Sequence, residues 1–165
     1  MIREIQAEDA AAFLQLGKQL DEETTFMLLE PGERDTTVEQ QAKMIQRFIE
    51  NNNSIIFVAS DGAELVGFIL ANGGNVQRNK HTAAIVIGIL QEYSGKGIGT
   101  ALFKEIEKWA RLHDVWHLEL TVMAHNTRAQ ALYKKEGFAQ EGVKKASLIF
   151  DGKDVDEYYM AKLLK

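Results

Sequence analysis

Apolar residues follow two different spacings along the chain, and each spacing predicts one type of secondary structure. In some stretches they recur every three or four residues, as on one face of an amphipathic helix; elsewhere they alternate with polar residues or form short runs, as in strands. The pattern predicts helices over 7–21, 36–49, 98–113 and 126–137, and strands over 3–6, 54–59, 65–71, 81–90, 116–122, 142–150 and 157–164. The chain therefore has an α/β element order, β-αα-βββ-α-β-α-ββ.

Turn and capping residues mark the borders of these elements. Asp61-Gly62 and Asp151-Gly152 are typical of hairpin turns, and Thr36 with Glu39 matches the capping box of a helix. Residues 24–35, which contain the only proline, form a polar loop. Because no repeat, linker or low-complexity tract divides the 165 residues, we expect a single domain over 1–165.

The segment that says most about function is the glycine-rich turn between the apolar strand at 81–90 and the helix that begins at Ile98. Gly95, Gly97 and Gly99 permit positive φ and let a ligand approach the main chain. The free N–H groups of the first helical turn then face that ligand, so the turn predicts an anion site, most often for a phosphate. A tight turn without any ligand is the alternative.

Spacing excludes the two commonest nucleotide-binding motifs. A P-loop needs a glycine five residues before the Gly95-Lys96 pair and a Ser or Thr after it, but Leu90 and Gly97 stand there. A dinucleotide fingerprint needs a glycine at position 100, which is Thr100.

A second pattern lies downstream, where the alternating strand at 116–122 leads into a short helix. Asn126 is a good N-cap for that helix, and Gly137 is placed to end it in the left-handed conformation. The three- and four-residue spacing puts three side chains on one helix face, namely Ala129, Leu132 and Tyr133.

Together the two patterns resemble those of the GNAT superfamily of N-acetyltransferases. The acyl-CoA pyrophosphate loop of that family reads Arg or Gln, two residues, Gly, one residue, Gly or Ala; Gly97 and Gly99 match it, but its first position is Ser94. The second motif reads Asn, two residues, Ala, two residues, Leu-Tyr, then Gly-Phe, and Asn126 to Phe138 match it. The resemblance implies the GNAT fold around a mostly antiparallel sheet, with acetyl-CoA held by Ile89, Leu90, Gln91, Ser94, Gly95, Lys96, Gly97, Ile98, Gly99, Thr100, Asn126, Ala129 and Tyr133.

The same resemblance implies transfer of an acetyl group to an amine by direct attack in a ternary complex. It assigns the Tyr133 hydroxyl as general acid to the departing CoA sulfur, and a main-chain N–H within 89–91 as donor to the oxyanion.

The sequence gives a weaker signal for the general base than for the general acid. Some relatives carry a Glu where this chain has Thr121, and Glu119 lies two residues earlier, on the same strand face. Glu119 is therefore our candidate base, the alternative being a solvated surface carboxylate. The carboxylates near the loop at 24–35 are further candidates, namely Glu22, Glu23 and Glu30.

Composition narrows the function classes that remain. The net charge of −5 argues against broad nucleic-acid binding and favours a cationic acceptor such as an amine. No segment is apolar enough to span a membrane, and the absence of cysteine suits a reducing, cytoplasmic location. His113 and His117 have metal-like spacing but fall on different elements, so we expect no metal, and we interpret His81 and His125 as loop or cap residues rather than bases.

Two readings of the function remain at this point. The first is an acetyltransferase for a small-molecule amine or a protein N-terminus, acting as a monomer or a homodimer. The second is a non-catalytic acyl-CoA-binding module of the same fold, which Ser94 and the missing strand carboxylate favour. Tyr133, which is needed only for turnover, favours the enzyme.

Overall fold

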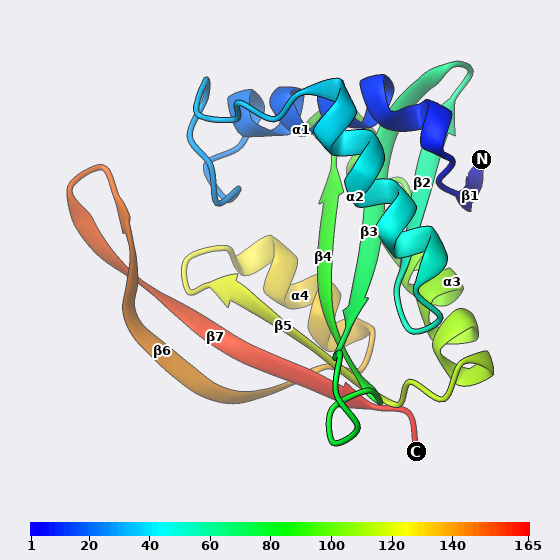
Figure 1. Ribbon diagram of the computed structural model, residues 1–165. Helices are drawn as coiled ribbons and strands as arrows, with labels where there is room; N and C mark the ends of the chain where they lie inside the picture. Colours follow the sequence, from blue (N-terminus) through cyan, green and yellow to red (C-terminus); the bar gives the residue numbers. More distant parts are fainter.

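The computed structural model describes all 165 residues and has the predicted order of helices and strands. Figure 1 shows a single twisted sheet with helices on both sides. The strands are β1 (Ile2–Glu4), β2 (Ile55–Asp61), β3 (Glu64–Gly73), β4 (Thr82–Ile89), β5 (His117–Met123), β6 (Ala139–Phe150) and β7 (Lys153–Leu163). The helices are α1 (Ala10–Glu23), α2 (Val38–Glu50), α3 (Ile98–Leu112) and α4 (Thr127–Lys135), with short 3₁₀ turns at Ala7–Asp9 and Gln91–Tyr93.

The sheet is mostly antiparallel, as predicted, and its strand order is β1-β2-β3-β4-β5-β7-β6. The single parallel pair is β4 with β5. These two strands pair over only three residue pairs, Thr82 with His117, Ala83 with Leu118 and Ala84 with Glu119. Beyond that point the two strands diverge (Figure 1), and the region between their unpaired parts is called the opening below.

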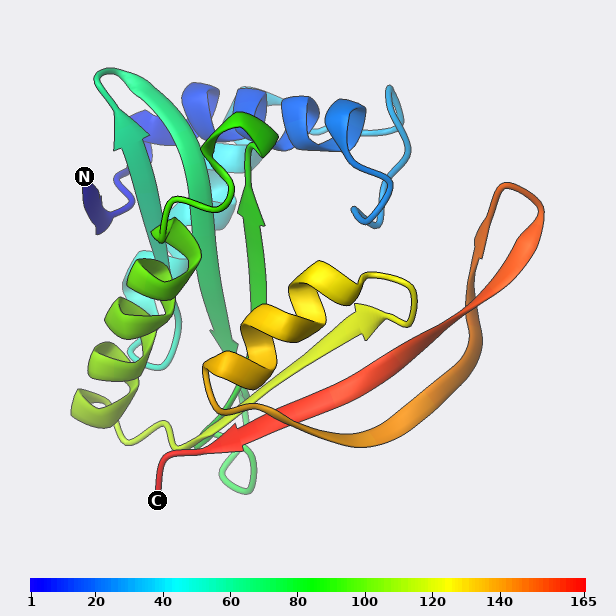
Figure 2. The ribbon, with the colours of Figure 1, turned by 180° about the vertical axis from the view of Figure 1, so that it is seen from behind.

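Two hydrophobic clusters hold the helices to opposite faces of the sheet. The helices α1 and α2 cover one face, where Leu16, Leu20 and Ile45 pack on Val58 and Phe68. The helices α3 and α4 lie on the other face (Figure 2). There the cluster contains Leu102, Ile106, Leu118, Leu120 and Tyr133. No helix combines the length and the hydrophobicity that crossing a membrane requires.

The capping box of α2 lies one residue later than the sequence pattern suggested. Thr37 rather than Thr36 is the N-cap: its hydroxyl accepts from the Gln40 N–H at 3.1 Å, and the Gln40 side chain accepts from the Thr37 N–H at 2.9 Å. The prediction of Thr36 with Glu39 was wrong because consecutive residues both satisfy the capping pattern.

A buried ion pair fastens the loop between α1 and α2 to α1. The Asp21 side chain is only 1% exposed and accepts two hydrogen bonds from the Arg34 guanidinium, at 2.7 and 2.9 Å. Gly17 leaves room for this guanidinium, because a Cβ at that position would lie 3.2 Å from the Arg34 Cζ. The pair thereby ties the far end of the α1–α2 loop back to α1.

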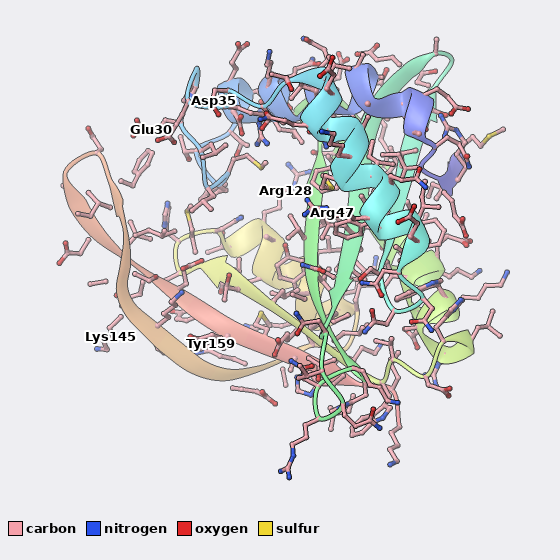
Figure 3. All side chains as sticks on the ribbon, viewed as in Figure 1. Glu30, Asp35, Arg47, Arg128, Lys145 and Tyr159 are labelled. Carbon is pink, nitrogen blue, oxygen red and sulfur yellow. The ribbon has the colours of Figure 1, made fainter.

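Arg34→Ala should lower the free energy of unfolding by about 3 kcal/mol, because it leaves the Asp21 carboxylate buried without a partner. Urea unfolding monitored by circular dichroism would measure the loss. Arg47→Ala is the matched control, since Arg47 is an exposed arginine of α2 with no ion pair (Figure 3). Equal midpoints for the two variants would contradict a stabilising role for the Asp21–Arg34 pair.

Candidate active site

The divergence of β4 from β5 leaves main-chain groups of β4 without a strand partner. The Leu90 N–H donates to the Val66 carbonyl at 2.9 Å, which fixes the hydrogen-bonding register of β4 on β3. In an antiparallel pair only alternate residues bond to the partner strand. The N–H and C=O groups of Ile87 and Ile89 therefore point away from β3, into the opening between β4 and β5.

This register distinguishes among the three predicted oxyanion donors. Leu90 donates to Val66, and the Gln91 N–H donates to the Glu23 carboxylate at 2.6 Å. Of residues 89–91, only Ile89 presents its N–H to the opening. Ile87, which the motif did not single out, has the same orientation.

The glycine-rich turn at the end of β4 has the backbone geometry of an anion site. Gly95 and Gly97 both have positive φ, at 74° and 85°. Gly97 is the N-cap of α3, and a Cβ there would meet nothing within 4 Å, so the space above it is open. The first intrahelical bond runs from the Ala101 N–H to the Gly97 carbonyl, which leaves the preceding N–H groups free to bind a ligand.

Three other predicted residues of this turn have structural roles as well. Gly99 lets α3 approach α4 closely, because a Cβ on it would lie 3.0 Å from the Leu132 Cδ2. The Ser94 hydroxyl turns back and donates to the Leu90 carbonyl at 3.3 Å. The Lys96 ammonium lies over the Tyr93 ring, 5.3 Å from its centroid.

Tyr133 is placed by α4 on the sheet face that α3 covers. Its ring packs against Phe103 and Phe138, with centroid distances of 5.9 and 6.2 Å, and belongs to the cluster against which Ile87 and Ile89 pack. Burial raises the pKa of the Tyr133 hydroxyl to about 12. The hydroxyl makes no hydrogen bond to the protein and is not sealed from solvent. At neutral pH it is therefore protonated and free to donate.

Asn126 caps α4 as predicted, with its side-chain oxygen accepting from the Ala129 N–H at 3.2 Å. The two amide hydrogens of the side chain make no hydrogen bond to the protein and can donate to a ligand. Ala129 packs against the same apolar cluster as Tyr133.

Glu119 lies on the opposite face of β5 from Tyr133. Leu118, Leu120 and Val122 are buried under α3 and α4, so the alternation of the strand turns Glu119 to the other side. Its side chain is 51% exposed, and its carboxylate lies 3.4 Å from the His117 Nε2. The paired residues on the neighbouring strands are Ala84 and Ala161, which are small and leave space beside the carboxylate.

The other candidate carboxylates are arranged differently. Glu23 bonds to the Gln91 N–H, as described above, and so connects α1 to the end of β4. Glu22 and Glu30 are exposed, and neither carboxylate takes part in a hydrogen bond or an ion pair. No three His, Asp or Glu side chains come together in a way that could hold a metal ion.

An aromatic contact that the sequence did not reveal lies beyond the end of β5. Phe26 from the α1–α2 loop lies 5.0 Å from His125, and His125 lies 6.2 Å from Phe150 at the end of β6, measured between ring centroids. These residues come from three distant segments and carry no motif, so only the folded chain shows that they meet.

Comparison with known proteins agrees with this architecture. The model of the acetyltransferase (GNAT) family matches residues 18–138. The L-amino acid N-acetyltransferase AaaT of Escherichia coli K12 is 32% identical over an alignment 110 residues long, which covers 64% of this chain and 66% of that protein. The chain thus matches slightly less than two thirds of this relative's length.

Solved structures agree over the whole chain. A GNAT-family acetyltransferase from Streptococcus pneumoniae superposes with a TM-score of 0.95 and 29% identity, covering 99% of both chains. A putative acetyltransferase of Salmonella typhimurium, YncA, solved with its cofactor acetyl-CoA, has a TM-score of 0.87 and 15% identity, covering all of this chain and 94% of the other. The chain belongs to the GNAT family of acetyltransferases, and its sheet, with β4 and β5 diverging, is the fold of that family.

Proposed function

We propose that this protein is an N-acetyltransferase that moves an acetyl group from acetyl-CoA to a primary amine by direct attack in a ternary complex. The observation that carries the proposal is the opening between β4 and β5, with an acid on one side and a base on the other. The protonated hydroxyl of Tyr133 lies on one face of the sheet and the carboxylate of Glu119 on the other. Aminolysis of a thioester needs both, together with a donor for the oxyanion.

The glycine-rich turn is our candidate for the pyrophosphate site of acetyl-CoA. It offers free N–H groups at the positive end of the α3 dipole, and the open space above Gly97 admits a phosphate. The unpaired main-chain groups of Ile87 and Ile89 suit the amide groups of the pantetheine arm, which would take the place of a neighbouring strand. The bound cosubstrate supplies the activated acetyl thioester.

The protein residues divide the proton transfers between the two faces. Glu119 accepts a proton from the ammonium form of the acceptor, and the neutral amine forms the new C–N bond. The Ile87 or Ile89 N–H stabilises the negative charge that develops on the carbonyl oxygen. As the C–S bond breaks, Tyr133 donates its proton to the sulfur. The nitrogen, now bonded to the acetyl carbon, gives up its second proton, which solvent relays to Tyr133, and Glu119 releases the first proton to bulk solvent.

We propose an α-amine as the acceptor, either of a free amino acid or of a protein N-terminus. The name of the E. coli relative, which is an L-amino acid N-acetyltransferase, supports this class. A peptide α-amine has a pKa near 8, roughly two units below that of a lysine side chain, so it needs less help from a base. Release of CoA thiol with L-amino acids, short peptides and polyamines would identify the acceptor, and acetyl-CoA binding without turnover on any amine would favour the non-catalytic module.

Gly97→Asp should abolish the rise in melting temperature that acetyl-CoA produces. It places a Cβ and a negative charge where the phosphates are expected, while the fold has space for the side chain. Differential scanning fluorimetry with acetyl-CoA would test this. Gly152→Asp is the control, because Gly152 also has positive φ and open space but lies at the tip of the β6–β7 hairpin. An undiminished shift in Gly97→Asp would exclude the turn as the phosphate site.

Tyr133→Phe should lower kcat about a hundredfold, the usual contribution of a positioned general acid, and leave acetyl-CoA affinity little changed. The ring keeps its packing, so the melting temperature should stay close to that of the parent. Steady-state kinetics of thiol release would measure the effect, with Tyr158→Phe on β7 as the matched loss of a phenol. A kcat within threefold of the parent would remove Tyr133 from the mechanism.

Glu119→Gln should lower kcat/KM for the amine about tenfold or more at neutral pH, since a general base contributes at least that much. The deficit should shrink as the pH rises above the pKa of the acceptor, because the amine then needs no base. Glu23→Gln keeps an oxygen to accept from the Gln91 N–H and serves as the comparison. A pH-dependent deficit in Glu23→Gln instead would transfer the role of base to Glu23.

A further inference from the structure

Position 94 offers no donor to a ligand at the pyrophosphate turn. The family pattern places a long polar side chain there, whereas this chain has Ser94. A serine hydroxyl has a single hydrogen to donate. In the structure the Ser94 hydroxyl donates this hydrogen to the Leu90 carbonyl, with 3.3 Å between the two oxygens. The turn therefore lacks a side-chain contact to phosphate at the position where relatives provide one.

Arg128 brings a guanidinium to this same turn from a different element. It is the second residue of α4, and its Nη2 would lie 3.3 Å from a Cβ built on Gly95. Arg128 is exposed, and its side chain makes no hydrogen bond or ion pair with the protein (Figure 3). All its donors are thus available beside the free N–H groups of the turn.

The position of Arg128 in its own helix is electrostatically unfavourable. The first turn of α4 contains no acidic residue, and a cation there faces the positive end of the helix dipole. The helix dipole does not stabilise this charge, yet the guanidinium lies against a glycine of the neighbouring turn. A ligand outside the helix best explains this placement. Lys135, at the other end of α4, lies 3.4 Å from the Thr100 hydroxyl and adds positive charge to the same region.

We propose that Arg128 binds the pyrophosphate of acetyl-CoA and replaces the side chain that the family pattern places at position 94. A guanidinium suits this role because its planar fork binds two phosphate oxygens at once. The main-chain N–H groups of the turn then hold the phosphates from one side and Arg128 from the side of α4. The inference rests on the proposed function, in that the turn must hold the pyrophosphate.

The test measures acetyl-CoA affinity by isothermal titration calorimetry. Arg128→Ala should weaken binding about 10- to 100-fold, as expected for the loss of charged hydrogen bonds. Lys134→Ala, which removes an exposed charge from the same helix, should leave affinity unchanged. Acetyl-pantetheine, which lacks the pyrophosphate, should be used equally well by the parent and by Arg128→Ala.

A rescue variant separates phosphate binding from a structural role. The backbone at Ser94 is extended, with φ −72° and ψ 151°, and arginine adopts this conformation without strain. Ser94→Arg in the Arg128→Ala background should restore most of the affinity. No loss of affinity in Arg128→Ala, or no recovery on adding Ser94→Arg, would overturn the proposal.

Three further outcomes show which assignment has failed. If the effect of Arg128→Ala disappears with dephospho-CoA, Arg128 binds the 3′-phosphate and the pyrophosphate assignment is wrong. If Gly97→Asp abolishes binding and Arg128→Ala does not weaken it, the turn holds the phosphates without Arg128. If neither variant changes the affinity, the proposed location of the cosubstrate itself fails.

Discussion

The candidate site depends on one constraint, the early end of the pairing between β4 and β5. Buried main-chain N–H and C=O groups almost always have partners, so a strand that loses its neighbour within a sheet must find another. Here the parallel pairing ends at Ala84 and Glu119, and β4 continues for five residues without β5 beside it. Because β3 fixes the register, the unpaired groups are those of alternate residues, including Ile87 and Ile89. A ligand with its own amide groups can satisfy them.

The two-residue period of β5 places the proposed acid and the proposed base on opposite faces of the sheet. Odd positions such as Glu119 and Thr121 face the side of α1, and even positions such as Leu118 and Leu120 pack under α3 and α4. The apolar side buries the Tyr133 ring and raises the pKa of its hydroxyl. The open side leaves Glu119 half in water. One strand thus creates two environments suited to opposite proton transfers.

The helices, the strands and the glycine-rich turn could be predicted because each has a local signal. The spacing of apolar residues located the elements, and the succession of Gly95, Gly97 and Gly99 after a buried strand located the turn. Local signals fail where two neighbouring residues satisfy the same pattern, as Thr36 and Thr37 do at the start of α2. They also fail for contacts between distant segments. Neither the Asp21–Arg34 pair nor the approach of Arg128 to Gly95 has any sequence signature, because each depends on how separate elements pack.

Gly99 connects the position of the turn to that of Tyr133, the proposed general acid. It allows α3 to approach α4 until Leu132 fills the space that a Cβ would occupy, and Tyr133 is the next residue of α4. A larger residue at 99 would push α4 outward and draw the phenol away from the opening, although it touches neither the opening nor the phenol. The packing of Gly99 against Leu132 therefore couples the turn proposed to hold the phosphates to the phenol proposed to act at the thioester. A substitution at position 99 would change the distance between these two parts of the site without touching either of them.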